Sequence, residues 1–578
     1  MAKKPDFVSL AQLAAMVADG AAICVGGLHF SRLPLALLKE IVSQGRKNLE
    51  YVTWGGGLAL EILLATNAVR KMVFCFSSLD IFGLAPLFRK VLEDGTVEVE
   101  EWNALAMIQG FNAAEQQLLS MPFQLPVGSE LIERSNFAPV YTDPVSGERV
   151  GVARALNLDV FLLHAQRADE AGNVEIQGAR GLDKSAIGAS KKVIVTVEEI
   201  VPVGTFQKDR RGLIIGHTFI TAIAHVPGGA YPTSCIPYYI TDYRAILEAT
   251  TSVPVALKPP VADRFELLQK AAHIPAATVT GPVLLKHRTN HDLDAPTTID
   301  EHMVIALSHH FDDESVCAAG AVSPLAIISY MLAKKMHAPH LVTMMISSGL
   351  VDPCVRPMLM LLSESVDFKT SAFHCGGDDT YHWYYQRGLV SHEVVSAAQI
   401  DRFGRANNIM LTSPSGKKVR LPGQGGMADV ANMHQNFLMY ITRHSPLTLV
   451  QDVQYVSAAR GLVSDEERLK HGFRPGYTRL VTNLGIFEVN KETRLLELVS
   501  SFPGVSLEQI RAETGFEIIL APSYRVAEQP TSAELKVLRT EIDPLGIRRL
   551  EFVPSKDRIQ LITELLNTEE GVIRELIS

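Results

Sequence analysis

The sequence predicts an α/β protein built from two related open α/β domains in tandem, each with a mostly parallel sheet and helices on both of its faces. Two observations lead to this fold class. Short runs of β-branched and other apolar residues alternate with segments of helical spacing, which is typical of buried parallel strands joined by crossover helices. The same order of strand, glycine turn and helix then recurs in the second half of the chain.

The first half begins this alternation with an apolar run at 23–27 that ends in glycines. Helical spacing follows at 34–45, so the glycines mark a turn from a strand into a helix. Further strands are predicted at 49–54, 71–78, 159–165, 191–201 and 211–216, and a further helix at 55–65. Near the end of the chain, an amphipathic helix from about residue 534 and a final helix over 555–577 are expected to be packing elements.

Two pairs of segments indicate an internal duplication, with coincidence as the alternative. Cys24-Val-Gly-Gly and Cys317-Ala-Ala-Gly each precede a helical segment that begins with Pro-Leu-Ala. Segments 164–176 and 397–411 each place Gln, Asp, Gly and Asn in that order between apolar runs. The partners of the two pairs are not equally far apart, as expected of diverged halves with different insertions.

The duplication divides the chain into a first domain at 1–285 and a second at 301–578. Between them, residues 286–300 are polar, contain proline and lack periodicity, as linkers do.

The composition limits the class of protein. With 578 residues, of which 47% are hydrophobic and 20% charged, and a net charge of −9, the chain is too apolar to be disordered. It has no apolar run of the roughly 18 residues that a spanning helix needs, no signal peptide pattern and no long basic run. We therefore expect a cytoplasmic protein with no membrane partner and no nucleic-acid partner. Its six cysteines are scattered without C-x-x-C pairs, which indicates reduced thiols and no metal site.

Gly26 and Gly27 lie between a predicted strand and a predicted helix and form the first candidate ligand site. Glycine lets the backbone approach a ligand closely, and the N-terminus of the following helix favours anions. A tight turn with no ligand is the alternative. His29 lies within this turn, where it is either a base or the partner in a structural hydrogen bond.

The loop Gly423-Gln424-Gly425-Gly426-Met427 is the second candidate, and it opens a helical segment. Successive backbone N–H groups in such a loop form a nest for an oxyanion or a phosphate. A mobile glycine turn is the alternative. The loop lacks the Lys-Ser/Thr that ends the phosphate loops of NTPases, so it is not of that kind.

Three further side chains could act on a substrate. Glu100 and Glu101 end a strand-like run, where one could enter a pocket and plain solvation is the alternative. Ser347 follows an apolar run and precedes Ser348-Gly349, which could form a nucleophile turn, although Gly-x-Ser-x-Gly is absent.

Taken together, these motifs resemble the family I CoA-transferases of the glutaconate type, with the A and B subunits fused in one chain. The segments that carry the resemblance are GLHFSRLPLAL (27–37), GTVEVEEWNALAM (95–107) and HAQRADEAGNVEIQG (164–178) for the A subunit, and PLAIISYMLAKKMHAPHL (324–341), AAQIDRFGRANN (397–408) and LPGQGGMADVA (421–431) for the B subunit. The resemblance implies the CoA-transferase fold, an acyl-CoA substrate with coenzyme A as its thioester, and a homo-oligomer. It also implies a site between the halves, with Gly425, Gly426 and Met427 as oxyanion donors that face Gly26 and Gly27.

One residue departs from the family pattern. In the B subunits of that family, a glutamate attacks the acyl-CoA carbonyl, and the resulting anhydride takes CoA as a glutamyl thioester. Ser347 stands at this position here, with Ile346 in the alternative register. A serine ester is a poor acceptor for returning CoA, so the departure favours hydrolysis over transfer. A displaced carboxylate such as Glu364, expected in a loop, would keep transfer possible.

The chain is also similar to the steroid-ring CoA hydrolases, which lack the nucleophilic glutamate and cleave a carbon–carbon bond of a cyclic 1,3-dicarbonyl with water. Their carboxylate lies in the segment that corresponds to 98–105, and Ala104 occupies its position here. The resemblance therefore implies an acyl-CoA hydrolase that acts on the thioester or on a ring. The alternatives are a CoA-transferase with a displaced carboxylate and a catalytically silent acyl-CoA-binding protein. The candidate catalytic residues are Glu101, Glu100, His29 and Ser347.

Overall fold

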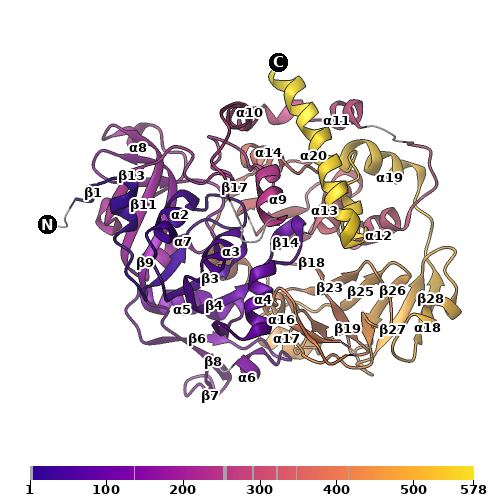
Figure 1. The fold of residues 1–578 in the computed structure, drawn as a ribbon. Coiled ribbons are helices and arrows are strands. Elements are labelled where there is room, and N and C mark those ends of the chain that lie inside the picture. The colour runs from indigo at the N-terminus through magenta and orange to yellow at the C-terminus, as the bar shows by residue number, and fades with distance from the viewer. Residues whose placement is uncertain are drawn as a thin grey trace.

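The structure, a computed structural model, confirms the α/β class and is organised around two ten-stranded sheets (Figure 1). It describes residues 4–135, 137–251, 257–288, 292–320, 323–346, 348–413 and 415–578. The strands of the first sheet are β1 (Asp6–Phe7), β2 (Ala22–Val25), β3 (Leu49–Gly55), β4 (Val69–Phe76), β5 (Glu98–Glu101), β9 (Leu158–Asp169), β10 (Val174–Ile176), β11 (Ser190–Val201), β12 (Leu213–Ile215) and β13 (Ala222–His225). Neighbours in the order β1-β13-β11-β9-β2-β3-β4-β5 all pair in parallel, while β10 pairs antiparallel with β9 and β12.

The second sheet repeats the central order of the first. Its strands are β14 (Val316–Ala319), β15 (Val342–Met345), β16 (Leu350–Val351), β17 (Phe373–His374), β18 (His392–Ser396), β23 (Asn436–Ile441), β25 (Thr478–Thr482), β26 (Gly485–Val489), β27 (Leu496–Ser501) and β28 (Ile519–Val526). The parallel series β15-β14-β18-β23-β25 has the same chain order as β3-β2-β9-β11-β13. In both series the chain enters at the second strand, adds one strand on one side and then crosses to the other side. The shared order supports the predicted relation between the halves.

One turn occurs in both halves at the position that the repeated Gln-Asp-Gly-Asn pattern predicts. Asp169 ends β9, and its carboxylate accepts hydrogen bonds from the N–H groups two and four residues further on, at 3.0 and 2.9 Å. Asp401 ends β19 (Gln399–Asp401) and accepts the same two bonds at 3.0 and 3.1 Å. Gly172 and Gly404 have φ of +92° and +70°, which glycine adopts without steric cost. The two sequences therefore encode the same turn by the same chemistry.

The largest hydrophobic cluster spans both halves of the chain. The helices include α3 (Gly57–Ala65), α4 (Pro86–Asp94), α5 (Ala104–Glu115), α13 (Pro324–Met336), α14 (Ser363–Thr370) and α16 (Met427–Met433). Leu105 and Phe111 of α5 share this cluster with Val430 of α16, and α5 is buried along almost its whole length. Each such side chain contributes about 1.5–3 kcal/mol when it is fully buried. This shared cluster therefore joins the two halves.

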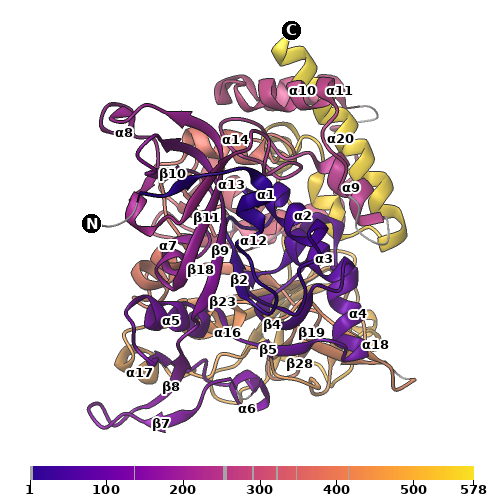
Figure 2. The ribbon, with the colours of Figure 1, turned by 60° about the vertical axis from the view of Figure 1, so that its left-hand side comes forward.

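The last helix of the chain packs against helices of the first half. α20 (Ser555–Ile577) lies beside α10 (Ala262–Ala272) and α11 (Gly281–His287) in both views (Figures 1 and 2). Leu565 of α20 and Leu284 of α11 belong to one hydrophobic cluster. The amphipathic face of the final helix is therefore a packing face, as its spacing predicts.

The predicted linker begins within α11, and α12 (Ile299–Ser308) starts near its end. Residues 292–298 form neither helix nor strand, and the division of the chain at 286–300 stays a prediction. The amphipathic helix expected from about 534 is α19 (Ser532–Val537), continued by a π-helical turn at Leu538–Ile542. Among the described residues, no helix combines the length and the apolar character that crossing a bilayer requires.

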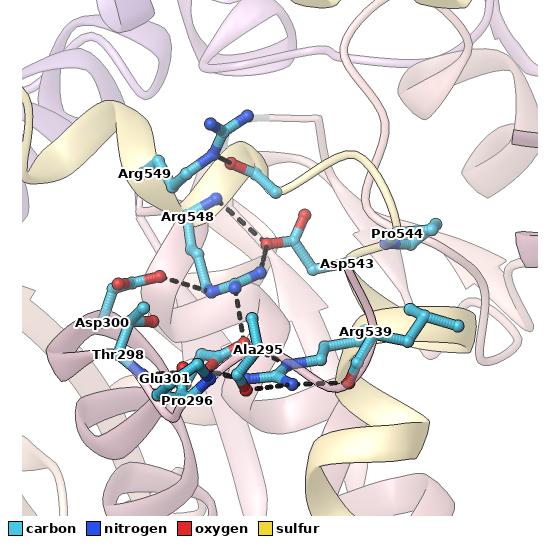
Figure 3. Close-up of polar contacts among 12 residues, drawn as sticks. Ala295, Pro296, Thr298, Asp300, Glu301, Arg539, Asp543, Pro544, Arg548 and Arg549 are labelled. Atoms are coloured by element: carbon cyan, nitrogen blue, oxygen red, sulfur yellow. Dashed lines mark hydrogen bonds and ion pairs between the residues drawn. The ribbon is translucent and has the colours of Figure 1, made fainter. Parts of the chain in front are cut away.

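A buried ion network ties the start of α12 to the segment that precedes α20 (Figure 3). The guanidinium of Arg548 lies 2.6 Å from Asp300 and 2.9 Å from Glu301. It also donates to Asp543 at 2.8 Å, while Arg539 donates to both oxygens of Glu301 at 2.7 Å. Burial alone would raise the pKa of Glu301, but the two guanidinium groups outweigh burial and lower it. These ion pairs fix the segment that precedes α20 to the start of α12.

Removal of the Arg548 guanidinium leaves three buried carboxylates short of a partner. We expect Arg548→Ala to lower the free energy of unfolding by about 3–5 kcal/mol, measured by urea unfolding. Arg549→Ala is the matched control, because the Arg549 side chain donates only to backbone oxygens, and its effect should stay within about 1 kcal/mol. Equal losses in the two variants would contradict the role of the network.

Candidate functional site

A cavity of about 950 Å³ lies between the two halves. Its wall includes the carboxyl ends of β3 and β4 in the first half and of β18 and β23 in the second. Open α/β sheets bind ligands beyond the carboxyl ends of their strands, and this volume suits a ligand of cofactor size. The cavity therefore lies where the resemblance implies a site.

The predicted glycine loop is part of the cavity wall, through Gly423, Gly425, Gly426 and Met427. The N–H groups of Gly423, Gly425 and Met427 donate to backbone oxygens at 2.9–3.1 Å. Of these four residues, only Gly426 has an N–H without a protein acceptor in the described part of the chain. The loop thus offers one free backbone donor to a ligand oxygen, rather than a set of three.

Gly26 and Gly27 are absent from the cavity wall in the described structure. The N–H of Gly26 donates to the carbonyl oxygen of Leu162 at 2.8 Å, and that of Gly27 donates to the carboxylate of Asp183 at 3.0 Å. Gly27 has a φ of +79°, and a Cβ there would lie 2.4 Å from the carbonyl oxygen of Ser31. The pair forms the tight turn that was the alternative, and neither N–H is free for a ligand.

His29 lines the cavity together with Asp80, which lies 3.0 Å from its Nδ1. Burial alone would lower the pKa of His29, but the charge of Asp80 outweighs burial and raises it. The two residues have φ of +54° and +51°, a strained conformation that is rare outside glycine and that clusters at functional sites. The pair therefore favours a protonated imidazole at the cavity.

Glu100 and Glu101 lie in β5, and neither is part of the described cavity wall. Glu100 forms ion pairs with Lys71 at 2.6 Å and with Arg154 at 2.7 Å. Glu101 is largely shielded from solvent and accepts a hydrogen bond from Arg420 at 2.6 Å. Burial raises the pKa of Glu101, although Arg420 opposes the shift. Both carboxylates thus have protein partners outside the cavity.

Ser347 lies outside the described residues, and its neighbour Ile346 is part of the cavity wall. Glu364 lies in helix α14, so the expectation of a loop there is wrong. Its carboxylate accepts hydrogen bonds from the hydroxyl groups of Ser31 at 2.6 Å and Ser234 at 2.5 Å. These contacts place Glu364 at the junction of the halves, where it binds the first half.

Glu393, a buried carboxylate of β18, is part of the cavity wall and was not among the residues predicted from the sequence. It accepts a hydrogen bond from the Tyr385 hydroxyl at 2.7 Å, and burial raises the pKa of Glu393 to about 7. Tyr385 and Tyr381 also line the cavity and belong to the π-helical turn η4 (Tyr381–Tyr385), a geometry frequent at functional sites. A carboxyl group that titrates near neutral pH at a cavity is suited to proton transfer.

His164, Glu198 and Cys235 form the one group of described residues with the ligand atoms for a metal ion. Nε2 of His164 lies 2.7 Å from Glu198, and Nδ1 lies 2.9 Å from the Thr196 hydroxyl. Glu198 also accepts a hydrogen bond from the Tyr239 hydroxyl at 2.6 Å, and burial raises the pKa of Cys235 far above its ordinary value. The His164 imidazole and the Glu198 carboxylate thus join β9 to β11.

The sequence model of the family "Coenzyme A transferase" matches residues 7–213 and 300–513, which is more than half of the chain. The 3-oxoadipate CoA-transferase of Pseudomonas knackmussii is similar through both of its subunits. The A subunit is 30% identical over 232 residues, covering 39% of this chain and 81% of its own length. The B subunit is 26% identical over 242 residues, covering 42% of this chain and 91% of its own length.

The IpdA subunit of the cholesterol ring-cleaving hydrolase of Mycobacterium tuberculosis is 27% identical over 238 residues, which covers 39% of this chain and 81% of that protein. A protein of Archaeoglobus fulgidus is 30% identical over 234 residues, and the match spans 40% of this chain but only about half of that protein, 52%. Among solved structures, the acyl-CoA transferase YdiF from Escherichia coli O157:H7 has a TM-score of 0.66 at 12% identity and covers 95% of this chain and 98% of its own. At that identity the likeness concerns the fold alone.

Alanine at position 426 should displace the glycine loop, because its Cβ would lie 2.0 Å from the Tyr381 hydroxyl oxygen. We expect Gly426→Ala to cost about 1–3 kcal/mol of stability, measured by thermal unfolding. Addition of Tyr381→Phe removes the oxygen in the way and should recover part of the loss. Additive losses of stability from the two substitutions would contradict the contact. Gly216→Ala is the control, because a Cβ there meets only an ordinary contact at 3.7 Å.

The raised pKa of Glu393 predicts a pH-dependent stability. The folded pKa of about 7 lies above the ordinary 4.5, so the folded state binds this proton more tightly than the unfolded chain. The stability gained is complete below pH 4.5 and is lost as the pH rises through 7. Glu393→Gln removes this dependence, so its stability relative to wild type should rise by about 3 kcal/mol between about pH 4 and about pH 8.

Thermal unfolding at several pH values measures this difference. A stability difference that stays constant with pH would contradict the raised pKa. Glu508→Gln, at an exposed position in α18 (Leu507–Ala512), is the control: hydrogen bonds lower the pKa of Glu508, so this variant should not gain stability over wild type as the pH rises.

Proposed function

Because the chain belongs to the coenzyme A transferase family, we propose that it is an acyl-CoA-processing enzyme that hydrolyses its substrate, at the thioester or at a carbon–carbon bond of the acyl group. The observation that carries this proposal is Glu393, a buried carboxyl group with a pKa of about 7 in the wall of the cavity between the halves. A general base works best when its pKa lies near the working pH.

In the proposed reaction, Glu393 removes a proton from a water molecule, and the resulting hydroxide attacks the carbonyl carbon. The carbonyl electron pair moves onto its oxygen, where the free N–H of Gly426 stabilises the negative charge. When the carbonyl reforms, the carbon–sulfur bond breaks and the thiolate takes a proton from His29, whose imidazolium the charge of Asp80 stabilises. The products are a carboxylic acid and free coenzyme A.

The same groups could open a ring. Hydroxide would then attack a ring carbonyl of the CoA-linked acyl group, and the carbon–carbon bond would break in place of the carbon–sulfur bond. The electron pair of that bond leaves as an enolate, which takes the proton from His29. The aromatic side chains of the cavity wall, Trp54, Phe76 and Tyr381, suit an apolar acyl group.

Two facts favour hydrolysis over transfer. Ser347 stands where the family's nucleophilic glutamate is expected, and the displaced carboxylate considered for transfer, Glu364, is bound to two serines of the first half. The relatives include both a ring-cleaving hydrolase and CoA-transferases. Glu101 would then support the glycine loop through Arg420.

The organisation of the chain belongs to the same proposal. We infer two fused subunits at 1–285 and 301–578, joined by 286–300, in a cytoplasmic homo-oligomer that takes coenzyme A as the thioester of its substrate. The two separate matches to the family support this arrangement, as do relatives in which the A and B subunits are separate chains.

Glu393→Gln keeps the shape of the side chain and removes its base. We expect it to lower kcat for acyl-CoA hydrolysis by about 10²- to 10⁴-fold. In wild type, kcat/KM should rise with pH through an apparent pKa of about 7, because only the carboxylate can accept the proton, and this rise should be absent in the variant. Wild-type activity in Glu393→Gln would remove this residue from the mechanism, and Glu508→Gln serves as the control.

Chemical trapping separates hydrolysis from transfer. Wild type incubated with an acyl-CoA and then treated with borohydride or hydroxylamine should yield no modified glutamate by mass spectrometry. A glutamyl thioester trapped at Glu393 would show a CoA-transferase in which this residue is the nucleophile. Tight coenzyme A binding without turnover of any acyl-CoA would instead indicate a silent binding protein.

A further inference from the structure

The end of the cavity next to the C-terminal tail carries two arginines, Arg443 and Arg558. Arg443 follows β23, Arg558 lies in the first turn of α20, and both are part of the cavity wall. The first half closes this end, because a Cβ on Gly83 would lie 3.6 Å from Nη1 of Arg558. The guanidinium of Arg558 therefore lies where the tail meets the first half.

Neither arginine forms an ion pair with a carboxylate in the part of the chain that the structure describes. Arg443 donates to a backbone carbonyl at 3.1 Å, and Nε of Arg558 is buried without a hydrogen-bond partner. Glu551 also lines the cavity, but its carboxyl group accepts from the Tyr440 hydroxyl, and burial raises its pKa to about 7. A buried donor of a cation without a partner is costly, which favours an anionic ligand at this place.

We propose that Arg558 and Arg443 form an anion subsite for the phosphate groups of the coenzyme A thioester, an assignment that rests on the proposed function. Guanidinium groups bind phosphate through paired N–H donors, and Nε of Arg558 has no protein acceptor in the described structure, although the charge of Arg558 acts on the neighbouring Glu551. Ser555, the first residue of α20, lines the same end of the cavity. A carboxylate at the far end of the acyl group would offer the same charge, and the experiment below separates the two sources.

The difference in solvent exposure between the two ends of the cavity wall favours phosphate over an acyl carboxylate as the ligand of the arginines. Arg443 is exposed, whereas Glu393 is buried. The phosphates are the most strongly hydrated part of coenzyme A and its thioester is the reacting part, so this orientation leaves the phosphates near solvent and brings the thioester to Glu393. Arg558 lies beyond residue 513, where the match to the family ends, so the tail contributes this contact.

Calorimetric titration of the full chain with coenzyme A, and with pantetheine, which lacks the phosphates, tests the assignment without turnover. Arg558→Gln should weaken coenzyme A binding about tenfold or more and leave pantetheine binding unchanged. Arg558→Lys keeps the charge and should recover part of the affinity. Arg574→Gln, an exposed arginine of the same helix, is the matched control and should bind both probes as wild type does.

Unchanged coenzyme A affinity in Arg558→Gln would overturn the assignment to phosphate. If KM in that variant rises only for acyl-CoAs with a terminal carboxylate, compared with neutral acyl-CoAs of equal length, the anion is the acyl carboxylate. If neither the coenzyme A affinity nor KM changes in that variant, the two arginines do not form an anion subsite. Failure of the proposed reaction is distinct from these outcomes, because it appears as coenzyme A binding in wild type without hydrolysis of any acyl-CoA.

Discussion

The contact between Asp429 and the first turn of α5 is the interaction on which the cavity depends. Asp429 follows the glycine loop in α16, and its carboxylate accepts from the Leu105 N–H at 3.1 Å and from the Asn103 side chain at 2.7 Å. It thereby satisfies donors at the N-terminus of a helix in the other half. Before the loop, Arg420 is held by Glu101 in the same way. Two carboxylate contacts therefore fix the glycine loop on both sides, and the docking of the halves sets the position of its free N–H.

The arrangement of strands was predictable because these strands are buried on both faces. β9 and β11 each contain a short buried apolar run, at 160–163 and 193–195, and these runs made the strands visible in the sequence. The repeated turn at Asp169 and Asp401 was equally visible, since a carboxylate and a left-handed glycine must stand at fixed spacing. The partner of α20 was not predictable, because an amphipathic pattern shows that a face is covered but not by what.

The site was predicted only in part, since its chemistry depends on contacts that are distant in the sequence. Gly26-Gly27 and the loop at 423–427 look alike in sequence, yet Leu162 and Asp183 occupy the N–H groups of the first pair. Glu393 was missed because its neighbourhood in the sequence shows only one charge in an apolar strand. That charge was the available signal, because a glutamate in a buried central strand needs a partner or a function.

The cluster that Leu565 of α20 shares with Leu284 of α11 also has a consequence for folding during synthesis. The ribosome releases α10 and α11 long before α20, so their apolar faces have no cover while the second half is being made. Domains generally fold as they emerge, and exposed apolar surface invites aggregation. The nascent first half must therefore persist as an incomplete unit until the final helix arrives, and translation of that helix completes both its core and the arginine-bearing end of the cavity.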